Sequence, residues 1–366
     1  MSDNLRRYFA IQKALKSLRP TEPTGNVARH LNTLVMLIAG IIGSQKCHLP
    51  AVAKKVPTGA KPQSRVRRLE RFVANDAIDT KTYYLPYVQL LLASLPEGAL
   101  VVVIDGSEAG RHCVLLSINL VYKKRALPLC WLVVKGKKGH LPEKTHQELV
   151  EKAAEILPKQ RTVVFLGDGE FDGVDLLQTL QKQGWNYVCR TAKNVLLTEE
   201  GERFQPTDLL LQPGDRIELA DMGFTAAEYG PVLVGIVWES HWKEPLVLVS
   251  NLDFLVEAYA FYKRRFRIET FFSDQKSRGF YLGHSHISDT KHLDRLLIGT
   301  CLAYLWIVCL GAWVVRNGQL ALIHRADRCD WSLFHIGLNW IEFCLNEGLP
   351  LRAHFALSEG GFKSAG

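Results

Sequence analysis

The order of apolar segments between residues 98 and 194 is the strongest constraint on the fold of this chain. Continuous β-branched runs predict strands, and leucines and alanines at helical spacing predict two helices among them. The predicted order is three strands, a helix, a strand, a helix and a strand: Leu100–Ile104, Cys113–Tyr122, Leu127–Val134, Thr145–Leu157, Thr162–Leu166, Leu176–Gly184 and Tyr187–Arg190. Short loops between the first three strands indicate an antiparallel meander. Asp105 and Asp168 directly follow the first and fourth strands.

This order is that of the ribonuclease-H-like fold. A carboxylate after a buried strand has a rigid support, and two on adjacent central strands would converge on one cation. Either Asp105 or Asp168 alone is also typical of an Asp-Gly turn. We interpret the chain as an α+β protein with a ribonuclease-H-like catalytic core, a β-rich insertion and helical regions at both ends. The predicted boundaries divide the chain into five parts. These are a helical DNA-binding region (1–97), the first part of the core (98–194), the insertion (195–252), a catalytic helix that completes the core (253–292) and a helical C-terminal region (293–366).

The N-terminal region carries a concentrated positive charge. The chain has a formal net charge of +8, which is compatible with a polyanionic partner but does not require one. Between Lys46 and Arg71 there are eight basic residues and one acid, and prolines and glycine in the middle predict two short helices joined by a turn. A solvated charged face would explain most such runs. Cations gathered on two linked helices favour phosphate contacts, with Arg65 and Arg68 as candidates for DNA binding.

One apolar run raises the question of a membrane. Residues Leu296–Val315 contain no charge and are long enough to cross a bilayer. A helix buried on all sides has the same composition, and we predict such a core helix, with no membrane contact. Eight cysteines without a CxxC pair indicate buried thiols rather than disulfides or zinc. With a polar N-terminus, these features predict a cytoplasmic protein.

A third acid lies in a predicted long helix from Asp253 to about Lys276. At 100° per residue, Tyr262, Arg265, Glu269 and Lys276 fall within about 60° of one another. One face would therefore present a phenol, a guanidinium, a carboxylate and an ammonium. An ordinary pair of charges at i and i+4 would explain Arg265 and Glu269, but leaves Tyr262 and Lys276 unexplained.

The spacing of these four residues resembles the Y-(2)-R-(3)-E-(6)-K signature of the insertion-sequence-4 family of bacterial DDE transposases. The resemblance implies that Asp105, Asp168 and Glu269 are the catalytic and metal-binding carboxylates. It implies DNA contacts for four further residues: Tyr262, Arg265 and Lys276, which would hold phosphates near the scissile bond, and Arg190 in the strand after the second aspartate. It further implies cut-and-paste transposition on the terminal inverted repeats of the chain's own element, with a homodimer that synapses two ends before joining them to target DNA.

Three converging carboxylates suit two Mg²⁺ ions about 3.5–4 Å apart, with Mn²⁺ as a substitute. One ion would activate water or a DNA 3′-hydroxyl, and the other would stabilise the leaving 3′-oxygen. Three alternatives remain: a ribonuclease-H-like nuclease that only hydrolyses DNA, an inactive domesticated DNA-binding protein, and a membrane protein built around residues 296–315.

The insertion departs from the family in one respect. The best-known members stack a flipped base on a tryptophan just before a strand, and this chain has Glu244 to Val249 at the corresponding place. Trp238 and Trp242 lie nearby, and either can stack a base or pack in the core. Whether a DNA hairpin is formed stays open at this stage.

Overall fold

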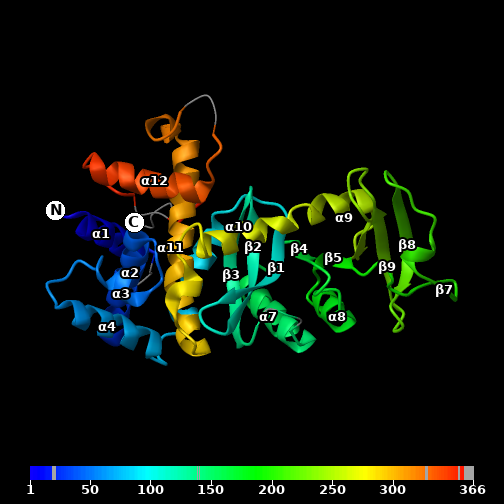
Figure 1. The fold of residues 1–366 in the computed structure, drawn as a ribbon, viewed down its shortest axis with the longest axis horizontal. Coiled ribbons are helices and arrows are strands. Elements are labelled where there is room, and N and C mark those ends of the chain that lie inside the picture. Colours follow the sequence, from blue (N-terminus) through cyan, green and yellow to red (C-terminus); the bar gives the residue numbers. More distant parts are fainter. Residues whose placement is uncertain (19–21, 138, 140, 326–328, 353–354, 358–366) are drawn as a thin grey trace.

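The computed structural model describes residues 1–18, 22–137, 139, 141–325, 329–352 and 355–357. The described strands form one mixed sheet in the order β3-β2-β1-β4-β5-β10-β9-β8-β6-β7. Helices flank this sheet and form a separate bundle at one end of the molecule (Figure 1). The predicted α+β fold class is confirmed.

The central part of the sheet is the predicted meander followed by two parallel strands. It comprises β1, β2, β3, β4 and β5: Leu100–Ala109, Cys113–Tyr122, Arg125–Lys135, Val163–Gly167 and Asn186–Thr191. β1, β2 and β3 pair antiparallel, whereas β4 pairs parallel with both β1 and β5. The first strand does not end at Ile104 as predicted, because its pairing with β2 continues to Ala109 opposite Cys113. Asp105 therefore lies inside a strand.

The predicted β-rich insertion contains five strands that continue the same sheet. They are β6, β7, β8, β9 and β10: Leu197–Glu199, Glu202–Phe204, Arg216–Phe224, Tyr229–Val237 and Leu246–Ser250. The last of them, β10, returns beside β5 and pairs with it antiparallel, with Val247 opposite Thr191. The insertion is thus bound to the core by backbone hydrogen bonds rather than by a flexible linker.

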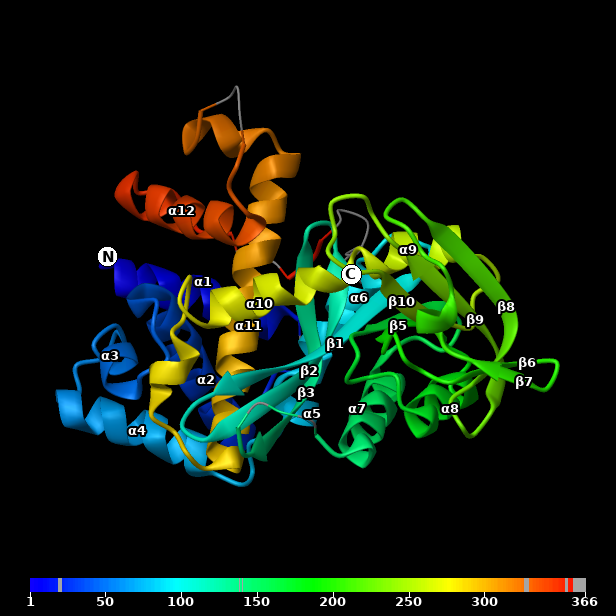
Figure 2. The same cartoon turned by 45° about the vertical axis from the view of Figure 1, so that its right-hand side comes forward.

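Helices cover both faces of the central strands. α7 (Glu143–Ile156) and α8 (Val174–Lys182) lie together on one side, while α9 (Leu255–Tyr262) and α10 (Ile268–Gln275) lie on the other (Figures 1 and 2). Because α9 connects the insertion to α10, the chain passes over the sheet where β1, β4 and β5 meet.

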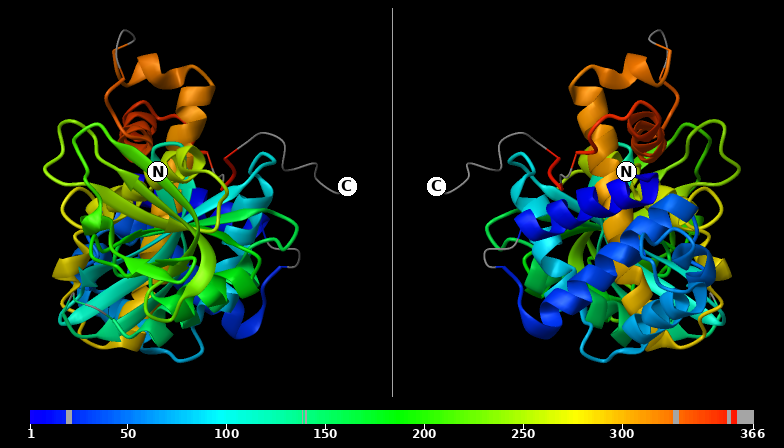
Figure 3. Two further views of the ribbon diagram at one scale, coloured as in Figure 1. Left: turned by 90° about the vertical axis from the view of Figure 1, so that its right-hand side faces the viewer. Right: turned by 90° about the vertical axis from the view of Figure 1, so that its left-hand side faces the viewer.

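The N- and C-terminal helices pack around one long helix, α11 (Thr290–Arg316). Figure 3, right, shows the N-terminal helices gathered beside it. These are α1, α2, α3, α4, α5 and α6, at Asp3–Ser17, Gly25–Ser44, Leu49–Ala53, Pro62–Ala74, Thr80–Tyr83 and Leu85–Ala93, while α12 at Leu333–Asn346 packs from the C-terminal side. The two short helices predicted between Lys46 and Arg71 are confirmed as α3 and α4.

Two helices, α2 and α11, are long and apolar enough to cross a membrane by length and composition. Within the protein, 89% of the most apolar window of α11 and 61% of that of α2 are buried. Such burial is typical of core helices, so these helices give no clear signal of a membrane protein. All eight cysteines are free thiols, and all but Cys329 are buried.

Candidate active site

The two aspartates on the sheet face each other through the register of β1 and β4. The last parallel pair is Val103 with Leu166, and Asp105 and Asp168 each follow their member of that pair by two residues. Because strand side chains alternate between faces, the equal offset puts both carboxylates on the same face. Backbone amides steady them: Gly106 N–H donates to Asp105 Oδ1 at 2.6 Å, and Glu170 N–H donates to Asp168 Oδ1 at 3.0 Å.

The predicted single helix from Asp253 to Lys276 is wrong, because the chain breaks between α9 and α10. A 3₁₀ turn at Arg265–Arg267 separates them, and Lys276 already has non-helical angles of φ −96° and ψ −121°. The Arg264 N–H bonds the Phe261 carbonyl at 2.8 Å, which closes a tighter turn than an α-helix makes. A uniform 100° spacing therefore does not hold across this segment.

The break directs Arg265 into the sheet. Its guanidinium Nη1 lies 3.9 Å from Asp105 Oδ2 and 3.6 Å from Asp168 Oδ2, and its Nη2 lies 3.9 Å from Glu269 Oε1. The whole residue is only 8% exposed, and Phe266 stacks on the guanidinium at 4.4 Å. The three acids that sequence analysis selected thus surround one buried cation.

Exposure of the three carboxylates rises from the floor of the site to its mouth. The side chain of Asp105 is 11% exposed, that of Asp168 33% and that of Glu269 62%. When all three are ionised, three negative charges face one positive charge and leave a net charge of −2. A partly buried site with excess negative charge is stabilised by additional cations, and Glu269 is the most exposed of the three carboxylates.

A model of the family described as "Transposase DDE domain" matches residues 99–306, more than half of the chain. The chain belongs to the DDE transposases. It is therefore an enzyme that cleaves and joins DNA, and this class of domain uses divalent metal ions. The solved structures similar to it include a "Cryo-EM structure of piggyBac transposase synaptic complex with hairpin DNA", with 10% identity, a TM-score of 0.46, and coverage of 100% of this chain and 87% of that chain. No curated protein matches it.

The three acids around Arg265 have the chemistry of ligands for a hard divalent cation. Asp105, Asp168 and Glu269 offer carboxylate oxygens, the ligands that such ions prefer. Within the described residues no three His, Cys, Asp or Glu side chains are already grouped as a metal site, and Arg265 lies among the three carboxylates. The three carboxylates are therefore of the right chemical type to bind the ion, and in this structure the Arg265 guanidinium is the positive group that they share.

Two further acids near Asp168 face other partners. Glu170 Oε1 accepts the Leu141 N–H at 3.1 Å and lies 3.7 Å from His146 Nε2. Burial raises the pKa of Asp172. Glu170 is thus engaged in contacts that hold the loop after β4.

An aromatic cavity opens beside the carboxylates and was not found from the sequence. Its volume is about 200 Å³, and it is lined by Arg190, Trp242, Glu244, Pro245, Leu246, Tyr259, Tyr262, Lys263, Arg265 and Phe266. Burial raises the pKa of Tyr262 to about 12, so its hydroxyl keeps its proton at neutral pH and can donate a hydrogen bond. Arg190 lies 3.9 Å from Glu244 in the cavity wall. Trp242 also lines the cavity, whereas the Trp238 indole donates to the Trp242 carbonyl at 3.1 Å.

The remaining predicted DNA contacts lie farther from the carboxylates. Lys276 directly follows α10, seven residues or roughly 10 Å along the axis from Glu269. On α4, Arg65 Nε donates to the Ala60 carbonyl at 2.8 Å and Arg68 Nε donates to the Thr33 hydroxyl at 3.2 Å. Two other arginines of α4, Arg67 and Arg71, line an open hollow on its outer face, and the same basic run could have nominated them.

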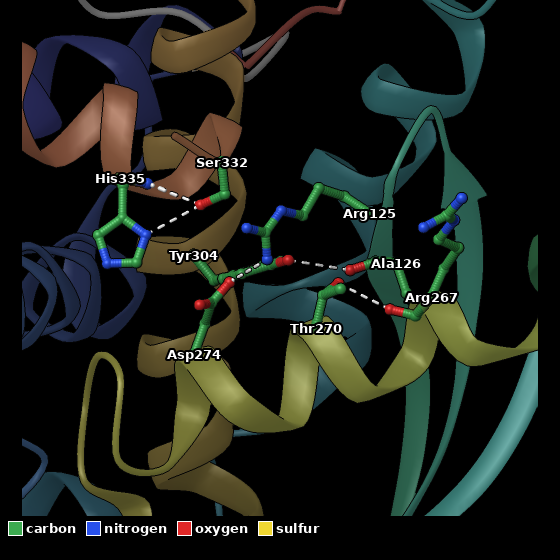
Figure 4. Close-up of polar contacts among 8 residues, drawn as sticks. All are labelled: Arg125, Ala126, Arg267, Thr270, Asp274, Tyr304, Ser332 and His335. Carbon is green, nitrogen blue, oxygen red and sulfur yellow. Dashed lines mark hydrogen bonds and ion pairs between the residues drawn. The ribbon is translucent and has the colours of Figure 1, made fainter. Parts of the chain in front are cut away.

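A buried ion pair that the sequence did not reveal holds α10 against β3. Asp274, in the last turn of α10, accepts from Arg125 Nη1 of β3 at 2.6 Å (Figure 4). Burial raises the pKa of Asp274 to about 6, so the pair is charged at neutral pH. Nearby, the Tyr304 hydroxyl donates to the Ala126 carbonyl at 3.2 Å and joins α11 to β3 (Figure 4). Asp274 thus fixes the last turn of α10, while Glu269 lies in its first turn.

Proposed function

We propose that this enzyme is an insertion-sequence-4 transposase that excises and inserts its own element by a cut-and-paste reaction on its terminal inverted repeats. The observation that carries the proposal is the meeting of Asp105, Asp168 and Glu269 around Arg265 at 3.6–3.9 Å. The three acids come from β1, the end of β4 and α10. The resemblance to the insertion-sequence-4 family makes all three catalytic and makes the arginine a phosphate-binding residue.

Asp105, Asp168 and Glu269 would hold two Mg²⁺ ions, with Mn²⁺ as a substitute. When bound, such ions supply the positive charge that makes water or a DNA 3′-hydroxyl a better nucleophile and that stabilises the leaving 3′-oxygen. Asp105 is buried, and the bond from the Gly106 N–H to its Oδ1 fixes the orientation of the first carboxylate. The more exposed Glu269 sits where DNA would approach.

Arg265, Tyr262, Arg190 and Lys276 would position the DNA backbone. A guanidinium can bind a phosphate through two parallel hydrogen bonds, and a buried one has few other partners. The Tyr262 hydroxyl stays protonated and lines the same cavity as Arg190 and Arg265, so it can donate to a phosphate oxygen. Together these groups would fix a scissile phosphate before any bond is broken.

We extend the proposal to the partners of the enzyme. The enzyme would bind double-stranded DNA, both the terminal repeats of its element and the target. Arg65 and Arg68 belong to the N-terminal region, which would contribute to this binding. A homodimer would synapse the two ends, and the reaction would take place in the cytoplasm.

The test is a cleavage assay with Mg²⁺ on DNA that keeps the flanking ends of the encoding gene. Wild type is compared with Glu269→Gln and with Glu257→Gln, a matched change at an exposed glutamate on α9. Wild type and the control should release end-specific 3′-hydroxyl products and join them to target DNA. The Glu269 variant should lose at least about 100-fold in rate while it binds DNA normally. Equal cleavage by both variants would contradict the metal-ligand role, and cutting without joining would indicate a hydrolytic nuclease.

A further inference from the structure

A second cationic cleft lies outside the candidate active site. It has a volume of about 540 Å³ and is lined by Lys46, His48, Tyr281, His284 and His286. We call it the histidine cleft. None of its lining residues is acidic, and four of the five can carry a positive charge. Its two walls come from the loop between α2 and α3 and from the segment that follows α10.

The two walls of the histidine cleft are fixed to each other. The Cys47 N–H donates to the Phe280 carbonyl at 2.8 Å, and both residues are buried. In the other wall, buried Leu282 and Ser285 alternate with the exposed lining residues. The imidazoles of His48 and His286 pack edge to face with ring centres 5.3 Å apart, and Tyr281 stacks on His284 at 5.9 Å. The cleft is therefore a built feature rather than a chance meeting of long side chains.

The backbone beside the cleft is held in an unfavourable conformation. Gln45, Tyr281 and His286 have φ values of 50°, 53° and 59°, in the left-handed region that side chains other than glycine usually avoid. Such residues persist where the surrounding structure requires them, and they gather at functional sites. Here they set the direction in which Tyr281 and His286 project.

Positive charge is crowded in this cleft. Burial lowers the pKa of His48, and the nearby His286 and Lys46 lower it further by charge repulsion. An anion bound there would relieve that repulsion. A metal ion is disfavoured by the Lys46 ammonium, and the described residues contain no group of three ligands with metal-binding geometry.

The location of the cleft indicates which anion it binds. Lys46 and His48 begin the basic N-terminal segment, whereas Tyr281 lies five residues after Lys276. The same wall continues to Ile287, whose carbonyl accepts the Arg111 N–H at 2.7 Å at the tip of the β1–β2 hairpin. β1 carries Asp105. A polyanion that crosses this cleft would be linked both to the N-terminal helices and to the strand of the first catalytic aspartate.

We propose that the histidine cleft binds a backbone phosphate of duplex DNA, and that it connects DNA held by the N-terminal helices to DNA in the active site. Lys46 supplies a fixed charge, His48, His284 and His286 donate from their rings, and Tyr281 donates from its hydroxyl. The inference rests on the proposed function, because it takes the same DNA as its ligand.

The test measures DNA binding without metal, so that no cleavage occurs. Fluorescence anisotropy with a duplex of the element's end, between 50 and 200 mM salt, compares wild type with Lys46→Ala and with the double variant His48→Ala/His286→Ala. The slope of log affinity against log salt should fall by about one for each phosphate that a variant no longer neutralises. Lys159→Ala, at an exposed lysine before β4, is the matched control and should keep the wild-type slope.

Further arms separate the outcomes. The variant His48→Lys/His286→Lys places a fixed cation at each position, and its slope should be at least as steep as that of wild type. Thermal melting checks the folding of each variant, and Lys46→Ala alone decides the question if the double variant does not fold. Unchanged slopes would overturn the cleft proposal alone and leave the cleavage assay unaffected. Inorganic phosphate is also titrated into wild type by calorimetry. If wild type releases heat on binding phosphate while the variants keep full DNA affinity, the cleft binds free phosphate and the DNA assignment is overturned. A wild type that binds no duplex would overturn the proposed function as well.

Discussion

Two buried arginines near α10 face carboxylates in different ways. Arg125 and Arg265 are each 8% exposed. Arg125 contacts one partner, Asp274, at 2.6 Å, while Arg265 has three partners at 3.6–3.9 Å. The first set is electrically balanced at short range. The second keeps two excess negative charges and makes no contact short enough for a strong ion pair.

This difference separates a closely matched ion pair from the candidate active site. The close geometry at Arg125 offsets part of the desolvation of Asp274, although burial still raises the pKa of Asp274. The Arg265 set buries a cation that leaves its carboxylates underneutralised, so the folded protein gains little from it. Such an arrangement is understandable where further cations and a phosphate complete the charge balance.

Breaking the balanced pair should have the largest effect. Arg125→Met leaves the Asp274 carboxyl buried without its partner, and should lower the free energy of unfolding by about 3–5 kcal/mol. Urea denaturation followed by circular dichroism measures the change. The double variant Arg125→Met/Asp274→Leu removes both charges and should recover most of the stability. A double variant as unstable as the single one would show that packing around Arg125, rather than its charge, is responsible.

The raised pKa of Asp274 predicts a pH dependence of stability. Because the folded pKa, about 6, lies above the ordinary 3.8, the folded state holds this proton more tightly than the unfolded chain. The resulting stabilisation is fully present below pH 3.8 and is lost as the pH rises through about 6. Its size is on the order of 3 kcal/mol for a side chain that is only 2% exposed. Unfolding free energies at pH 4 to 7 should fall more steeply in wild type than in Asp274→Asn, and parallel curves would disprove the assignment.

Whether the sequence predicts the contacts of these two arginines depends on how far apart the contacting residues lie in the sequence. Arg265 and Glu269 are four residues apart, and the Asp105 and Asp168 strands are recognisable as apolar runs, so local patterns sufficed to nominate the site. Arg125 and Asp274 are 149 positions apart, and no local pattern connects them. Their pairing depends on how α10 packs on β3.

Contacts between residues that are distant in the sequence also explain where the structure differs from the predictions. The end of β1 was misplaced because pairing with β2, not the composition of β1, carries the strand past Asp105 to Ala109. The continuous helix from Asp253 was wrong because the interior position of Arg265 requires a turn that helical periodicity cannot express. The aromatic cavity was missed because its walls come from the insertion and from α9, which meet only in the folded sheet.

Removing the shared cation should sharpen the contrast at the active site. In the DNA-free protein, Arg265→Gln frees three carboxylates from one positive neighbour, and its affinity for Mg²⁺ or Mn²⁺ should rise by roughly tenfold. Calorimetric titration of the metal measures this directly, with Arg264→Gln, at the exposed neighbouring arginine, as the control. The same Arg265 variant should bind the DNA end more weakly and with a flatter salt dependence. Metal affinity that stays equal or falls would mean that Arg265 organises the carboxylates instead of competing for them.

The smallest effect is expected at an ion pair on the surface of the insertion. Arg203 Nη2 lies 2.6 Å from Glu228 Oε1, the same distance as in the Arg125 pair, but the two side chains are 55% and 48% exposed. Water already solvates both charges, so Arg203→Ala should change the free energy of unfolding by less than about 1 kcal/mol in the urea assay. If it destabilised as strongly as Arg125→Met, distance alone would determine the strength of these pairs. A small effect would show that burial turns equal geometry into unequal stability.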